Sequence, residues 1–184
     1  MVAAVSGAIG IVLNVLLVTL GGPLGTLSDI ALFVMTLAIA PIMLGSYELG
    51  GVTPLWPARL SLAGGIGAVI VWSGIQAALI LGFVTFDDPA GRSGVFAIWN
   101  GALIVIGAWL TGAPLLAGPW LPGRLRWLGA LAGLGLILTG TVLLGGGGLP
   151  LAYIGGVGYL VLFPIWAFLV ARVFRSRAAG RPGG

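Results

Sequence analysis

The sequence predicts an all-α integral membrane protein, a bundle of six transmembrane helices with both termini in the cytoplasm. Of its 184 residues, 59% are hydrophobic and only 7% are charged, and the mean hydropathy is +1.19. A soluble domain of this size needs far more charge to cover its surface. Six apolar segments, each long enough to cross a bilayer, follow one another along the chain. We therefore expect a multi-pass protein of the cell inner (plasma) membrane.

The first two segments differ in how they begin. Ala3–Leu20 is apolar and has no basic region in front of it, so we expect a transmembrane helix here and no cleaved signal peptide. The second helix is expected over Ile30–Tyr47, with Ser28 and Asp29 as caps whose side chains accept hydrogen bonds from free backbone N–H groups. Pro41 lies inside this segment and should bend it, because its ring removes one backbone hydrogen bond.

The third segment, Leu60–Phe86, is expected to be an inner helix of the bundle. It is 27 residues long and carries no formal charge, so it can cross the bilayer with some tilt. Gly64, Gly65 and Gly67 near its start would let another helix approach closely, because glycine has no side chain to hold the two backbones apart.

The remaining helices are separated by turns rich in Pro and Gly. They are expected over Gly94–Leu116, Trp127–Leu144 and Pro150–Val170. In the fifth helix, Gly129 and Gly133 are four residues apart, a small-residue pair that favours helix contact. We expect residues 1–177 to form the transmembrane domain and residues 178–184 to form a flexible basic cytoplasmic tail.

Arginine placement predicts the orientation. One side of the predicted membrane holds seven arginines, which are Arg59, Arg124, Arg126, Arg172, Arg175, Arg177 and Arg181, and the other side holds only Arg92. Basic residues are retained in the cytoplasm, so both termini should lie inside. The last four of the seven could also contact anionic lipid, each contributing about 1 kcal/mol near the surface. We favour the simpler interpretation that they only set the topology.

Three amides are the candidate site. Asn14, Gln76 and Asn100 are expected about 10 to 15 Å below the outer surface, at 1.5 Å per residue, and could meet in one layer. One interpretation is an outward-facing pocket for a neutral or weakly polar ligand, with Trp72 and Trp99 on its walls. The other, which we favour, is that the amides only hold helices together, at about 0.6 kcal/mol per contact.

The missing residue types exclude several classes of activity. The chain has no Cys or His, and its eight basic residues are all Arg. No predicted helix interior carries a charged residue, which leaves hydroxyls and amides without a general base, so we expect no enzyme. We also expect no metal site, cofactor or nucleic-acid partner. Adjacent Asp87 and Asp88 supply too few ligands for a cation.

Two functions remain open at this point. The first is a non-enzymatic accessory, sensing or scaffold component of the membrane, whose partners would be membrane lipid and another membrane protein or a second copy of the chain. The alternative is a facilitator or channel for a small neutral or weakly polar solute, which would enter through the outward-facing pocket. Liposome permeability distinguishes the two.

Overall fold

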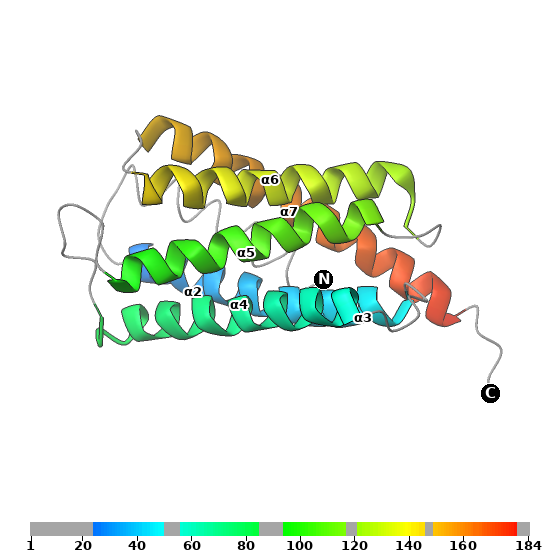
Figure 1. The fold of residues 1–184 in the computed structure, drawn as a ribbon, viewed down its shortest axis with the longest axis horizontal. Helices are drawn as coiled ribbons and strands as arrows, with labels where there is room; N and C mark the ends of the chain where they lie inside the picture. Colours follow the sequence, from blue (N-terminus) through cyan, green and yellow to red (C-terminus); the bar gives the residue numbers. More distant parts are fainter. Residues whose placement is uncertain (1–23, 50–55, 85–93, 117–120, 146–148, 180–184) are drawn as a thin grey trace.

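The structure is a computed structural model that describes residues 24–49, 56–84, 94–116, 121–145 and 149–179 (Figure 1). Within these ranges the chain forms helices and no β-strand. The helices in chain order are α2 (Leu24–Leu37), α3 (Ile39–Leu49), α4 (Trp56–Ile80), α5 (Gly94–Leu116), α6 (Gly123–Leu144) and α7 (Leu149–Ala179). The prediction of an all-α chain is confirmed for these residues.

Several of the described helices are long and apolar enough to cross a membrane. There are five such stretches in the described ranges, Asp29–Glu48, Ala58–Ile80, Gly94–Leu116, Gly123–Leu144 and Pro150–Arg177. The first combines α2 and α3, and the other four belong to α4, α5, α6 and α7. The chain is therefore a multi-pass membrane protein. The predicted first helix, Ala3–Leu20, lies outside the described residues, so the count of six remains a prediction.

The second predicted span begins earlier than expected and is broken. Helix α2 starts at Leu24, so the prediction that Ser28 and Asp29 cap it is wrong, and the Asp29 carboxylate lies inside the helix. The α-helix is interrupted at Ala38, where α2 gives way to α3. Pro41 follows three residues later. Its ring removes one backbone hydrogen bond and crowds the preceding turn, as the sequence predicted.

Glycines bring α5, α6 and α7 into close backbone contact. A Cβ atom built on Gly133 of α6 would lie 2.5 Å from the carbonyl oxygen of Gly107 on α5. On the other face of α6, a Cβ on Gly135 would lie 2.7 Å from the carbonyl oxygen of Gly155 on α7. Real side chains do not tolerate such distances, so these helices approach each other only because these positions are glycine.

The three glycines at the start of α4 differ in how closely other residues pack against them, which the sequence did not predict. A Cβ atom on Gly65 would lie 3.0 Å from the Trp109 ring and 3.1 Å from the Met43 side chain, so this position is tightly packed. At Gly64 and Gly67 no atom of the described residues lies within 4 Å of the same position. The expected close approach of another helix therefore occurs at one of the three glycines.

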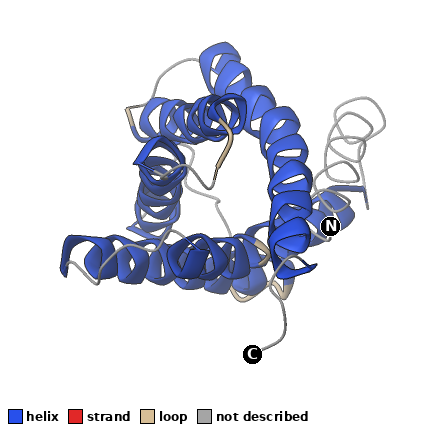
Figure 2. Ribbon diagram, turned by 90° about the vertical axis from the view of Figure 1, so that its right-hand side faces the viewer, coloured by secondary structure: helices blue, strands red, loops and turns tan. Residues whose placement is uncertain are grey.

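Helix α7 crosses the bundle obliquely. It begins beside α6 and ends near α3 (Figure 1), and the end view shows it running from one edge of the bundle to the other, toward the C-terminus (Figure 2). Its contacts agree with this path. Gly155 packs on α6, whereas the Phe174 ring would lie 2.8 Å from a Cβ atom on Gly45 of α3. Helix α7 thus joins the two sides of the bundle.

Candidate functional site

Two of the predicted site residues bond directly at the end of the bundle where α4 finishes and α5 begins. The indole Nε1 of Trp99 donates a hydrogen bond of 3.2 Å to Oε1 of Gln76. Gln76 is only 3% exposed, and the Trp72 ring stacks on Trp99 with ring centroids 5.4 Å apart. Since Trp72 precedes Gln76 by four residues, both side chains leave the same face of α4. The structure therefore brings Trp72, Gln76 and Trp99 together, and the two tryptophan rings stack on each other.

An acidic residue that the sequence did not assign to this site completes it. The side chain of Gln76 forms a hydrogen bond with Asp29 of α2. A carboxylate can only accept hydrogen bonds, so the amide nitrogen of Gln76 is the group that donates to Asp29. The three residues form a polar chain, Trp99 to Gln76 to Asp29, which links α5, α4 and α2. We call this set the polar chain.

Asn100 is buried at the same end of the bundle but serves a different interface. It is 0% exposed, and its Nδ2 donates a 2.9 Å hydrogen bond to the carbonyl oxygen of Phe96 in its own helix. Its backbone faces α6, where a Cβ atom on Gly140 would lie 3.0 Å from the Asn100 carbonyl oxygen. No described contact connects its amide with Gln76. Asn14, the third amide of the predicted layer, lies outside the described residues.

Three buried polar atoms at this end have no hydrogen-bond partner among the described residues. They are Nε1 of Trp72, Oγ of Ser73 and Oδ1 of Asn100. Leaving a buried polar atom unsatisfied costs about 1 to 3 kcal/mol, and an ordered water often removes that cost. These atoms could therefore form hydrogen bonds with a small polar molecule that reached them, Trp72 as a donor, Asn100 as an acceptor and Ser73 as either.

A second polar contact lies deeper in the bundle. The Tyr159 hydroxyl on α7 hydrogen-bonds with Thr36 on α2, and both residues are buried. Tyr159, Phe163 and Trp166 then form an aromatic row along α7, with successive ring centroids 5.2 and 5.9 Å apart. The row fills the interior of the bundle together with Met35 and other fully buried apolar side chains. Helix α2 is thus held by hydrogen bonds at two depths.

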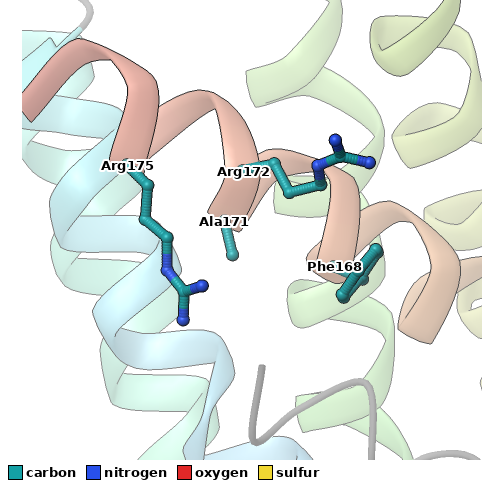
Figure 3. Close-up of a pocket in the computed structure, with 4 residues that line it drawn as sticks. All are labelled: Phe168, Ala171, Arg172 and Arg175. Atoms are coloured by element: carbon teal, nitrogen blue, oxygen red, sulfur yellow. The ribbon is translucent and has the colours of Figure 1, made fainter. Parts of the chain in front are cut away.

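The opposite end of the bundle carries the described arginines. Helix α7 continues to Ala179, nine residues beyond its predicted end, so Arg172, Arg175 and Arg177 are helical and exposed there. Arg181 lies outside the described residues. Phe168, Ala171, Arg172 and Arg175 line a shallow hollow of about 10 Å³, room for about one water molecule (Figure 3).

Neither a ligand cluster in the described ranges nor a known relative of the chain points to a function. In the described ranges no three Asp, Glu, His or Cys side chains gather where they could hold a metal ion. The chain matches no known protein family, no curated protein and no solved structure.

Proposed function

We propose that this chain is a non-enzymatic component of the plasma membrane, with an accessory, sensing or scaffold role, and that both of its termini are cytoplasmic. The observation that carries the proposal is the polar chain. Gln76 uses both ends of its amide on protein side chains, accepting from Trp99 and donating to Asp29. The stack of Trp72 on Trp99 covers this contact. Side chains so engaged join helices, which is the common use of amides inside membrane bundles.

The outer surface of the bundle is where such a component would interact with its partners. Large apolar side chains are exposed along the spans, among them Ile70 at 65%, Ile154 at 64% and Ile98 at 57%. In a membrane these faces contact lipid, another membrane protein or a second copy of the chain. Exposed Trp56 and Trp127 lie near Arg59, Arg124 and Arg126 in sequence, as interfacial anchors do. The same arginines support a cytoplasmic placement of this end.

A second candidate function is a facilitator for a small neutral or weakly polar solute. It is favoured by three buried atoms, on Trp72, Ser73 and Asn100, that have no hydrogen-bond partner in the described part of the chain and could bond to such a solute. Under this alternative the polar chain would line a pathway for the solute. Hydrogen bonds among Trp99, Gln76 and Asp29 would then be replaced, in passing, by hydrogen bonds to the solute.

The two functions predict different results in reconstituted vesicles. The purified full-length protein is placed in liposomes, and the uptake of glycerol, urea and small amides is followed by light scattering against empty liposomes. The proposed function predicts rates equal to those of empty liposomes and copurification of a stable membrane partner from mild detergent. Saturable uptake that is lost in Asn100→Leu, with the variant still folded, would overturn the proposal and establish the facilitator.

A further inference from the structure

One face of α7 combines exposed apolar residues with exposed arginines in a single line. It comprises Val161, Ile165, Phe168, Arg172 and Arg175, and we call it the α7 stripe. These positions are separated by four, three, four and three residues, the spacing that keeps side chains on one side of a helix. The three apolar members are 39%, 47% and 43% exposed. The stripe is therefore a continuous surface, apolar along the span and basic at its end.

We propose that the α7 stripe binds one anionic phospholipid. The phosphate lies between Arg172 and Arg175, and one acyl chain follows the apolar part of the stripe. The close-up shows the two arginine side chains on either side of Ala171, with the Phe168 ring beside Arg172 (Figure 3). Because the side chain of Ala171 is a single methyl group, a shallow hollow of about 10 Å³ remains there. A phosphate oxygen can enter this hollow while the rest of the headgroup stays outside.

The chemistry of the basic end fits a phosphate. Guanidinium groups present several N–H donors in a plane and pair well with phosphate oxygens. Their hydrocarbon stems can lie along the apolar surface while their charges remain at the headgroup level. Arg172 and Arg175 both occur just after the last apolar turn of the stripe, which is where phosphates lie in the bilayer.

The length of the apolar part fits one leaflet. From Arg172 back to Val161 there are eleven residues, which at about 1.5 Å each give a rise of about 16 Å. The hydrocarbon core of a bilayer is about 30 Å thick, so one leaflet supplies about half of that. A single acyl chain that starts at the arginines therefore runs alongside Phe168, Ile165 and Val161. Inorganic phosphate has no chain to make these contacts, and the proposal is specific to the lipid.

The chain offers a matched control for this site. Arg177 is exposed, belongs to the same helix end and carries the same charge. It follows Arg175 by two residues, and residues two apart on a helix do not share a face. If general positive charge holds the lipid, loss of Arg177 should weaken lipid binding as much as loss of Arg172. If the α7 stripe holds it, loss of Arg172 should weaken binding more.

The test measures retention of lipid by the purified full-length protein with native mass spectrometry. Phosphatidylglycerol and phosphatidylcholine with identical acyl chains are added to the parent protein and to Arg172→Gln, Arg175→Gln and Arg177→Gln. We expect preferential binding of phosphatidylglycerol, about fivefold weaker in each of the first two variants and changed less than twofold in Arg177→Gln. Equal unfolding temperatures show that the variants are folded, which is expected because all three residues are exposed.

Three results would overturn the proposal. The first is an equal loss in Arg177→Gln, which indicates general charge attraction. The second is equal retention of the two lipids by the parent protein. The third is displacement of phosphatidylglycerol by millimolar inorganic phosphate, which would identify a phosphate site that needs no lipid chain.

Discussion

The Trp99 indole donates a 3.2 Å hydrogen bond to the Gln76 side chain, and this contact ties α5 to α4 at one end of the bundle. Gln76 is only 3% exposed, so water cannot readily replace Trp99 as the partner of its side chain. The same amide reaches Asp29 on α2, so one side chain connects three helices. Gln76 therefore links α2, α4 and α5 at this end of the bundle.

Replacing Gln76 by Leu should lower the stability of the protein. The change keeps the size of the side chain but removes both of its hydrogen bonds, leaving the Trp99 indole N–H without its acceptor and Asp29 without its donor. Hydrogen bonds between membrane helices contribute about 0.6 kcal/mol on average and up to about 1.7 kcal/mol. We expect a loss of about 1 to 3 kcal/mol, measured by unfolding in mixed micelles with increasing denaturing detergent.

Ser73→Ala is the matched control for that measurement. Ser73 lies three residues before Gln76 on α4 and is also buried, but no described residue forms a hydrogen bond with its Oγ. Removing an unpaired hydroxyl takes away a buried polar group without breaking a bond, so stability should stay the same or rise slightly. A loss as large as that of Gln76→Leu would mean that Ser73 has a partner, such as a buried water.

The composition of this site was predictable from the sequence only in part. Trp72 and Gln76 are four residues apart on one helix, and Trp99 falls at a matching depth on the next, so periodicity and depth place them together. Asp29 was missed because Ser28 and Asp29 before an apolar run resemble an N-cap. The preceding residues, including Leu24 and Leu27, extend the helix by another turn and carry the carboxylate to the level of Gln76. That register depends on tertiary packing, which one sequence does not reveal.

Gly133→Ala should separate α5 from α6 and destabilise the protein strongly. The added Cβ atom would lie 2.5 Å from the Gly107 carbonyl oxygen and 2.5 Å from the Thr111 backbone nitrogen. Backbone atoms cannot move aside individually, so the helices must shift, at a cost of about 1 to 3 kcal/mol or more. The unfolding transition of the purified variant measures this loss.

Gly74→Ala supplies the comparison, because no atom in the described ranges lies within 4 Å of the Cβ position at Gly74 of α4. Alanine favours a helix over glycine by about 1 kcal/mol, so this variant should be as stable as the parent protein or more stable. If both variants lost stability equally, the contact between α5 and α6 would not depend on Gly133. The sequence predicts this contact from the Gly129 and Gly133 pair, but the same reasoning fails for Gly64 and Gly67, since spacing alone does not say which face of α4 meets a partner.

Reporter fusions test the proposed orientation. A fusion at Gly184 should behave as cytoplasmic and one placed after Asp88 as external, because seven of the eight arginines would then lie inside. The prediction concerns the whole chain, including the predicted helix Ala3–Leu20. An external signal from the C-terminal fusion would reverse the orientation and place the α7 stripe in the other leaflet.

The contact between Tyr159 and Thr36 predicts a measurable coupling between α7 and α2. Tyr159→Phe removes the hydroxyl and keeps the ring on which Phe163 stacks, while Thr36→Val removes the other hydroxyl at nearly constant volume. Each single variant should lose about 0.6 to 1.7 kcal/mol of unfolding free energy. Because both changes remove the same hydrogen bond, the double variant should lose less than the sum of the two. Additive losses would show that the hydroxyls act independently, and α2 would then be held by the polar chain and by apolar packing alone.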